Sequence, residues 1–217
     1  MENPLKIEAF PIGPLENNAF LVVDPESREA VLVDPGMGSE VIFEAIKEQG
    51  LRVTATLNTH AHFDHAYNNA IFRQELGCPL LMHEADLGLL REMSSHAALF
   101  GFPPRTSPDP DAFLTPGQEI RVGHGALRVL HTPGHTPGGV SFAAPGWVIT
   151  GDTLFAQSIG RTDLPGGDYD QLVHSIQTVL FTLPESTEVY PGHGPATLIG
   201  YEKRHNPFVK GLPAHVL

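Results

Sequence analysis

Four apolar segments of this 217-residue chain each run directly into a short stretch that carries histidine or aspartate. The apolar segments are residues 53–58, 127–130, 147–150 and 187–190. Their length and apolar content predict β-strands. Turns that follow strands at a common sheet edge lie close together, so we expect the four polar stretches to assemble a single site on a rigid scaffold.

Helical patterns alternate with these strands in both halves of the chain. This alternation predicts an α/β (α+β) fold in which two sheets pack together with helices outside them. Further strands are expected at residues 6–10, 19–24, 30–34, 79–82, 120–122 and 140–143, with a hairpin turn at 24–28. Helices are expected from an N-cap at Ser39 to Gly50, from the histidine-rich segment to about Leu76, over residues 169–183, and from near Thr197. The Pro-rich residues 87–113 show little periodicity, which fits either a substrate-facing lid or a surface connection.

The densest polar stretch is THAHFDH at residues 59–65. Three further candidates follow downstream in short turns: His135, Asp152 and His193. Together these segments hold five histidines and two aspartates, enough donors to bind two metal ions that share one ligand. The pattern therefore predicts metal-assisted hydrolysis.

Spacing suggests how the ligands divide between the ions. Residues two apart on a strand point the same way, so His60 and His62 can hold one ion while Asp64 and His65, beyond the turn, face the other. His135 and His193 arrive on separate turns, one to complete each coordination sphere. The bridging ligand is expected to be Asp152, because a carboxylate has two oxygens.

This ligand set suits zinc first, with iron or manganese as alternatives, since imidazole and carboxylate bind all three. Two such ions ~3.5–4 Å apart lower the pKa of a shared water to near ~7, which supplies a bridging hydroxide for attack on a carbonyl carbon. We expect Asp64 to have a second, catalytic role, orienting the nucleophile or accepting its proton.

Composition narrows the partners to small molecules. The length favours one domain spanning residues 1–217. A net charge of −12 argues against nucleic acid and against an anionic membrane surface. The sequence shows no secretory signal or membrane span, and the single Cys78 excludes an internal disulfide, so a cytoplasmic protein is expected. Nothing in the sequence specifies an oligomeric state.

The motifs around these residues resemble those of the metallo-β-lactamase superfamily. The resemblance implies an αββα four-layer sandwich of two mixed β-sheets with helices on the outer faces. It also implies His60, His62 and His135 on one ion, with Asp64, His65 and His193 on the other and Asp152 bridging. Within the superfamily the chain looks most like the short glyoxalase II-type hydrolases, in its segment GRTDLPGGD at 160–168 and in its ending EKRHNPF at 202–208. An aspartate at position 152, where the commonest β-lactamases have cysteine, disfavours antibiotic hydrolysis.

This resemblance implies hydrolysis of a glutathione thioester, S-2-hydroxyacylglutathione above all. The chain departs from standard glyoxalase II because it lacks the C-terminal helical region that supplies glutathione-binding groups. Arg161 is the leading candidate to hold a substrate carboxylate, and its alternative role is to fix its own loop by pairing with Asp163 or Asp168. The alternative functions are a mononuclear-iron persulfide dioxygenase and a hydrolase of another thioester or of a lactone.

Overall fold

The strands of the first part of the chain pair into a mixed six-stranded sheet with the order β1-β2-β3-β4-β5-β6. The computed structural model describes residues 4–209. The strands of this sheet are β1 Lys6–Ile12, β2 Asn17–Val23, β3 Glu29–Val33, β4 Arg52–Leu57, β5 Leu80–His83 and β6 Ala112–Leu114. β1, β2 and β3 are antiparallel, whereas β3 to β6 run parallel. The carboxyl ends of β3, β4 and β5 therefore meet at one edge.

A second mixed sheet has the order β14-β13-β10-β9-β8-β7. Its strands are β7 Glu119–Val122, β8 Gly125–His131, β9 Val140–Ala144, β10 Trp147–Gly151, β13 Glu188–Pro191 and β14 Thr197–Leu198. Only β10 and β13 are parallel. A small hairpin, β11 Leu154–Phe155 with β12 Ser158–Ile159, follows β10 and had no counterpart in the sequence analysis.

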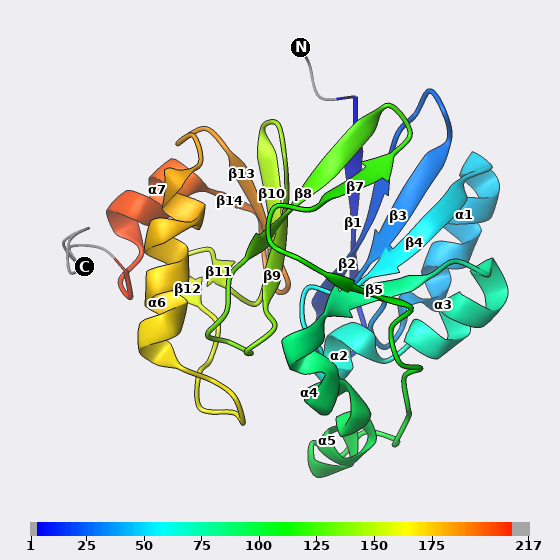
Figure 1. The fold of residues 1–217 in the computed structure, drawn as a ribbon, viewed down its shortest axis with the longest axis horizontal. Coiled ribbons are helices and arrows are strands. Elements are labelled where there is room, and N and C mark those ends of the chain that lie inside the picture. The colour runs from blue at the N-terminus through cyan, green and yellow to red at the C-terminus, as the bar shows by residue number, and fades with distance from the viewer. Residues whose placement is uncertain (1–3, 210–217) are drawn as a thin grey trace.

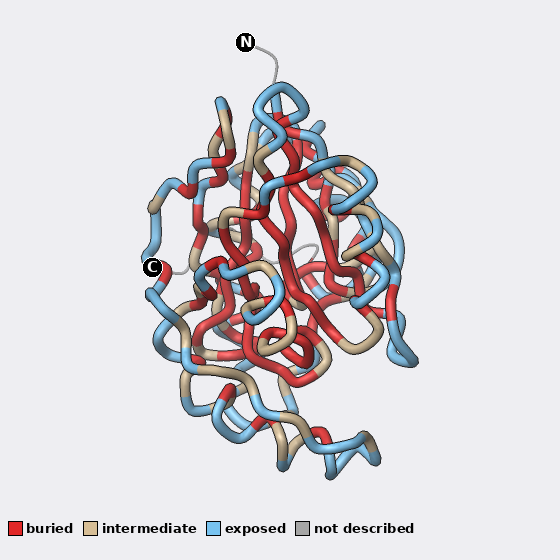
Figure 2. The backbone as a smooth tube through the Cα atoms, turned by 90° about the vertical axis from the view of Figure 1, so that its right-hand side faces the viewer, coloured by how far each residue is buried: buried red, intermediate tan, exposed pale blue. Residues whose placement is uncertain are grey.

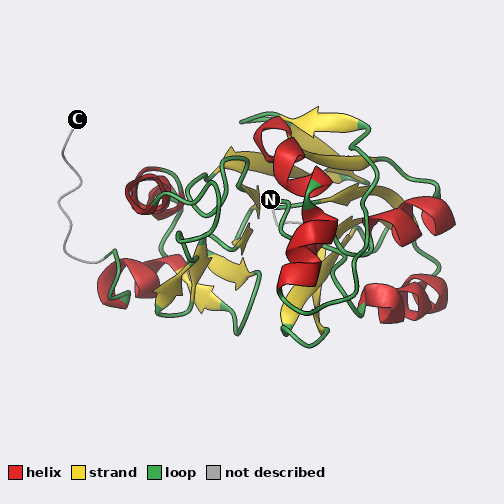
Figure 3. Cartoon of the chain, turned by 90° about the horizontal axis from the view of Figure 1, so that it is seen from below, coloured by secondary structure: helices red, strands yellow, loops and turns green. Residues whose placement is uncertain are grey.

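The two sheets face each other across an apolar core, and helices cover their outer faces (Figure 1). Phe20 and Leu57 from the first sheet meet Val129 and Phe142 from the second in this core, and burying each side chain of this size stabilises the fold by about 1.5–3 kcal/mol. The buried positions follow the central strands in Figure 2. Helices α1 Ile42–Gln49 and α3 Asn69–Leu76 cover the first sheet, and α6 Tyr169–Thr178 and α7 Ile199–His205 cover the second (Figure 3). The predicted αββα sandwich is thus confirmed.

Three predicted helix boundaries were wrong. A 3-10 turn at Ser39–Val41 precedes α1, and Ser39 makes no cap because its buried hydroxyl accepts a hydrogen bond from Asn68 instead. The helix after the histidine segment is split into α2 Phe63–Ala66 and α3, since the Asn68 side chain also donates to the backbone of Gly36. α6 ends at Thr178, and a 3-10 turn at Leu180–Thr182 follows it.

Residues 87–113 contain regular structure that the sequence analysis missed. Two short helices, α4 Leu87–Arg91 and α5 Met93–Leu99, open the segment, and β6 closes it. Leu90, Met93 and Ala97 are buried at helical spacing, packed with the ligand-bearing helix α2. The segment is therefore anchored against the site. None of the helices within residues 4–209 is long and apolar enough to cross a bilayer.

A pH-dependent contact joins the turns at one end of the two sheets. His124, in the β7–β8 turn, lies with Nδ1 2.8 Å from Oδ2 of Asp24, the residue that follows β2. The hydrogen bond with Asp24 raises the pKa of His124 above its ordinary 6.5. Burial alone would raise the pKa of Asp24, but hydrogen bonds from the backbone of His124 and Glu26 hold it well below its usual range.

We expect the stabilising effect of His124 to depend on pH with a definite sign. A histidine whose pKa is higher in the folded than in the unfolded protein contributes its full stabilisation at pH values below the unfolded pKa of about 6.5. This contribution is lost as the pH rises through the raised pKa of the folded state. His124→Asn should therefore lower the free energy of unfolding more at pH 5.5 than at pH 9, because Asp24 stabilises the protonated imidazole and higher pH removes that proton. Urea unfolding of metal-free wild type and variant measures this, and a deficit that grew with pH would contradict it.

Candidate metal centre

The structure brings all seven predicted ligands to one edge of the two sheets. His60 and His62 follow β4, and Asp64 and His65 lie in α2. The other three residues come from turns after strands of the second sheet: His135 after β8, Asp152 after β10, and His193 after β13. The site thus lies between the sheets and receives side chains from both.

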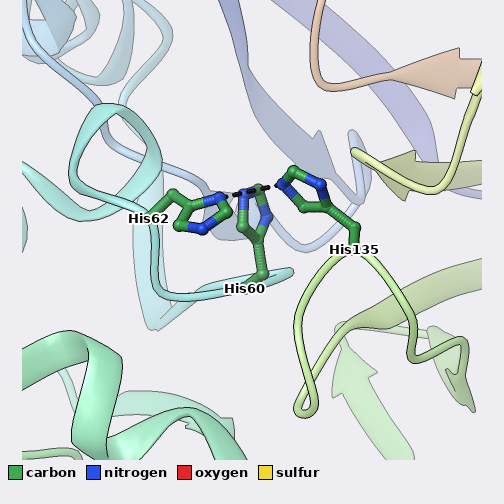
Figure 4. Close-up of side chains that lie close together, drawn as sticks. All are labelled: His60, His62 and His135. Atoms are coloured by element: carbon green, nitrogen blue, oxygen red, sulfur yellow. Dashed lines mark hydrogen bonds between the residues drawn. The ribbon is translucent and has the colours of Figure 1, made fainter. Parts of the chain in front are cut away.

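Three imidazoles form the first cluster, with one nitrogen of each of His60, His62 and His135 within 4.8 Å of the others. Their rings converge from two facing loops (Figure 4). Nδ1 of His62 and Nε2 of His135 are 2.8 Å apart, whereas two nitrogens on one tetrahedral zinc ion would be separated by about 3.3 Å. The cluster is close to the size that an ion requires.

Asp64, His65 and His193 form the second cluster, again with ligand atoms within 4.8 Å. Oδ2 of Asp64 lies 3.2 Å from Nε2 of His193 and 3.4 Å from Nε2 of His65. Asp152 stands between the clusters. Its Oδ1 is 3.4 Å from Nε2 of His65, and its Oδ2 is 3.5 Å from Nε2 of His135. A carboxylate in this position can reach an ion in either cluster.

Hydrogen bonds indicate which nitrogen of His60 is free. The Thr59 hydroxyl gives its one proton to the Asp34 carboxylate at 2.6 Å, so it must accept from Nδ1 of His60 at 3.0 Å. The Nε2 lone pair of His60 is then left buried without a hydrogen-bond partner, as is Oδ1 of Asp152. Buried polar atoms without partners are rare, and a bound cation would satisfy both. The residues therefore fit divalent metal ions.

Three other histidines of the site also use Nδ1 for a hydrogen bond to an oxygen acceptor. Nδ1 of His65 donates to the Asp34 carboxylate at 3.0 Å, that of His135 to the backbone oxygen of Arg161 at 2.7 Å, and that of His193 to the backbone oxygen of Leu15 at 3.0 Å. Each of these bonds leaves an Nε2 lone pair facing the centre. Such outer contacts set the tautomer and ring orientation of metal-binding histidines.

Burial and neighbouring charges determine which side chains of the site are neutral and which are ionised. Burial, reinforced by neighbouring imidazoles, lowers the pKa of His60 well below its ordinary value and that of His62 to about 3. Burial would raise the pKa of Asp64, but neighbouring His65 and a hydrogen bond with His193 hold it well below its usual range. Neutral His60 and His62 and ionised Asp64 are in the protonation states that bind metals. Burial would lower the pKa of His65 and of His193, but the neighbouring carboxylates of Asp64 and Asp152 raise both above the ordinary value, so an ion bound there would displace a proton.

Asp34 and Asp86 support the site and were missed in the sequence analysis. Asp34 follows β3, and its carboxylate accepts hydrogen bonds from the backbone and hydroxyl of Thr59 and from His65. His60, His65 and Asp34 also converge within 4.8 Å, but these bonds already use the carboxylate of Asp34, so we assign it a supporting role. Asp34 directly follows β3, and Asp86 ends the 3-10 turn Glu84–Asp86 after β5. The local signal was only an aspartate soon after an apolar strand, because the pairing of both strands parallel to β4 cannot be read from the sequence.

Asp86 joins the two loops that carry the first cluster. It is fully buried, and its carboxylate accepts from the backbone of Ala61 at 3.0 Å, the hydroxyl of Thr136 at 2.8 Å and the backbone of Gly138 at 2.6 Å. Burial raises the pKa of Asp86, although these hydrogen bonds oppose the rise. Ala61 lies between His60 and His62, so Asp86 determines how the facing loops approach each other.

Glycines allow the close approach of the second-sheet loops. Gly151 has a φ of 51°, and a Cβ there would lie 2.4 Å from the hydroxyl oxygen of Thr59. A Cβ at Gly192 would lie 2.2 Å from Oδ1 of Asp152. Larger residues at these positions would push the β10 and β13 turns away from the centre.

Arg161 lies beside the site with its guanidinium paired. Its Nε and Nη2 both donate to Asp163 at 2.7 Å, and about half of its side chain is exposed. Asp168, the other predicted partner, instead caps α6. The backbone oxygen of Arg161 also holds His135, so this loop supports a ligand whatever its side chain binds.

A cavity of about 450 Å³ opens onto the two clusters. His62, Asp64, His135, Asp152 and His193 form its floor, and the end of α5, the β11–β12 hairpin and the Arg161 loop contribute to its walls. Its volume is that of a small-molecule site. Five of the seven predicted ligands thus line a space that a substrate could enter.

Two curated relatives align along nearly the whole chain. The "Probable metallo-hydrolase YqgX" of Bacillus subtilis is 37% identical, over 96% of this chain and 99% of the relative. The hydroxyacylglutathione hydrolase GloC of Haemophilus influenzae is 36% identical, over 94% of this chain and 98% of the relative. The names of both relatives describe hydrolases.

Solved structures share the fold. BLEG-1, described as a B3 metallo-beta-lactamase, superposes with a TM-score of 0.87 at 39% identity, covering 95% of this chain and 100% of its own. TTHA1623 in a di-iron-bound form gives 0.85 at 40% identity, with 93% and 99% covered. ETHE1 from Myxococcus xanthus gives 0.76 at 30% identity, with 96% and 86% covered. Residues 12–193 match the family model of the metallo-beta-lactamase superfamily, and the chain belongs to this superfamily.

Proposed function

We propose that this protein is a dinuclear metal-dependent thioester hydrolase of the glyoxalase II type. The observation that carries the proposal is the position of Asp152, whose carboxylate lies between two clusters of possible metal ligands and lines the cavity that opens onto them. His60, His62 and His135 would hold one ion, and Asp64, His65 and His193 the other. Zinc is our first choice of metal, and the di-iron-bound neighbour supports iron as the alternative, ahead of manganese.

Bound ions would polarise the thioester carbonyl and lower the pKa of a water molecule to near ~7. The chain's own residues do the rest. Asp64 lines the cavity, and its proposed second role is to orient the attacking water or to accept its proton. Asp34 and Asp86 keep the imidazoles in position, and Arg161, which lines the cavity, is our candidate to hold one substrate carboxylate.

S-2-hydroxyacylglutathione is the leading substrate, supported by the similarity to GloC. The test is release of glutathione from S-lactoylglutathione by the metal-loaded protein under oxygen-free conditions, with metal content measured on the same sample. We expect catalytic turnover. A protein that holds two ions and releases no thiol from this or any other acyl thioester would contradict the proposal.

The similarities to two solved structures favour other reactions, so the assay should also include the substrates of those reactions. The similarity to ETHE1 supports the alternative of a mononuclear-iron persulfide dioxygenase, which would consume oxygen when glutathione persulfide is supplied. The similarity to BLEG-1 makes a chromogenic cephalosporin a necessary third substrate. Lactones complete the set. If turnover without oxygen is faster on a thioester than on the other substrates, our proposal is distinguished from the dioxygenase, the β-lactamase and the lactonase.

We expect Arg161→Ala to raise KM for a glutathione thioester about fivefold to tenfold while kcat and metal content stay the same. The reason is that a charge-assisted hydrogen bond to a substrate carboxylate contributes about 1–2 kcal/mol to ground-state and transition-state binding alike. Steady-state kinetics and metal analysis check this. Unchanged kinetics with a lowered melting temperature would assign Arg161 to fixing its loop through Asp163.

A further inference from the structure

The walls of the cavity over the metal centre are apolar. The end of α5 contributes Leu99 and Phe100, and the β11–β12 hairpin contributes Phe155 and Ile159. Phe63 lies between the ligand residues His62 and Asp64, and its ring is tilted by 31° against that of Phe100 with the ring centroids 5.6 Å apart. The apolar wall therefore runs from the solvent edge of α5 down to the ligand-bearing segment.

This wall exposes large apolar side chains to solvent. Leu99 is 82% exposed, Phe100 46% and Leu15 40%, and all three line the same cavity. Single exposed apolar residues are ordinary, but several gathered around one cavity mark a surface that binds an apolar group. Their position above the proposed metal ions makes a substrate the natural occupant.

Charge gives the complementary evidence. Arg161 is the one lysine or arginine among the described residues that line the cavity, and its guanidinium is already held by Asp163. His96, also in the lining, lies 3.6 Å from a carboxylate oxygen of Glu92. Glutathione carries two carboxylates and an ammonium group, and buried charges need partners. The cavity offers too few partners to enclose the tripeptide.

The geometry points to a specific division of the substrate: the cavity binds the acyl arm, and that arm is aromatic or aliphatic and larger than lactoyl. The thiol arm then extends out of the cavity, with at most one carboxylate at Arg161. This inference rests on the proposed thioesterase function. In the reaction, water adds to the carbonyl carbon, the carbon–sulfur bond breaks, and the sulfur takes a proton, which leaves a carboxylic acid and a thiol.

The kinetic test compares S-mandeloylglutathione with S-lactoylglutathione under oxygen-free conditions. The two share the thiol and the 2-hydroxyacyl head and differ in a phenyl against a methyl group. We expect kcat/KM to be about tenfold higher for the mandeloyl thioester, because its ring is buried against the cavity wall. Equal values, or a preference for lactoyl, would overturn the inference and leave the proposed function standing.

A binding measurement separates this inference from hydrolysis itself. Mandelate and lactate are the corresponding free acids, and calorimetric titration of the metal-loaded protein measures their Kd values without turnover. We expect mandelate to bind about tenfold more tightly. That result in a protein inactive on every thioester would refute the proposed function and keep the apolar subsite, whereas equal Kd values would refute the subsite.

Leu99→Ser and Phe100→Ser test the residues directly, since both side chains are exposed and their replacement spares the core. Each change should bring the mandeloyl-to-lactoyl ratio of kcat/KM, and the corresponding ratio of Kd values, from about ten toward one. The matched control is Leu198→Ser, which removes a leucine that is 43% exposed on β14 and lies outside the cavity lining. Ratios unchanged in the two cavity variants would contradict the assignment.

Discussion

Asp152→Ala is expected to lower the metal content from two ions per chain to one or none and kcat/KM by about a thousandfold or more. Bound ions supply several kcal/mol of transition-state stabilisation, and each 1.36 kcal/mol is tenfold in rate. The oxygens of Asp152 lie 3.4 Å from Nε2 of His65 in one cluster and 3.5 Å from Nε2 of His135 in the other. Its loss therefore affects both ions together.

The stability of the metal-free protein should respond much less to Asp152→Ala than the metal content and activity of the metal-loaded protein do. Oδ1 of Asp152 is buried without a hydrogen-bond partner but lies 3.4 Å from Nε2 of His65. The relief of the unpaired oxygen and the loss of this ion-pair contact oppose each other, so the melting temperature without metal should stay about the same. The increase in melting temperature on adding zinc or iron should shrink. Metal analysis, kinetics and thermal unfolding with and without chelator measure these effects. Asp170→Ala, on the exposed first turn of α6, is the matched control. Two retained ions with near-normal activity would refute the bridging role.

Asp86→Ala is expected to cause the largest loss of stability. The change leaves the backbone N–H groups of Ala61 and Gly138 and the hydroxyl of Thr136 buried without their acceptor. Breaking such a network costs about 3–5 kcal/mol in the free energy of unfolding, or about 10 °C in melting temperature for a chain of this size. Metal affinity should fall about tenfold to a hundredfold, because the loops of His60, His62 and His135 lose their common support.

Urea unfolding of the metal-free protein isolates the stability effect, and competition with a chelator measures the affinity. Glu84→Ala is the control, because Glu84 belongs to the same 3-10 turn and is exposed. We expect Asp86→Asn to lie between wild type and alanine, since an amide keeps one acceptor oxygen. A change within experimental error for Asp86→Ala would show that other contacts hold the loops.

The ligand candidates could be predicted because their signal is local. His60 and His62 were predicted to share one ion from their spacing of two residues, and they do converge, although β4 ends at Leu57 and both lie in the loop after it. The turns that carry His135 and His193 come directly after apolar strands. The same local patterns predicted most strands and the two-sheet architecture. They failed at Ser39 and Asn68, where side chains bind neighbouring loops rather than their own helix, and at α4 and α5, which are short and gain stability by packing on α2.

The sequence by itself determined which residue types could bind metal and which strands would present them, because strand periodicity and turn chemistry act over a few residues. Only the tertiary structure decided how those residues are supported. Asp34 and Asp86 reach the site because β3, β4 and β5 lie side by side and parallel, an order that local sequence does not encode. The apolar cavity wall likewise exists only because the fold brings the end of α5 and the β11–β12 hairpin to the same cavity. Contacts between distant segments depend on how the whole chain packs, and that packing decided what surrounds the predicted ligands.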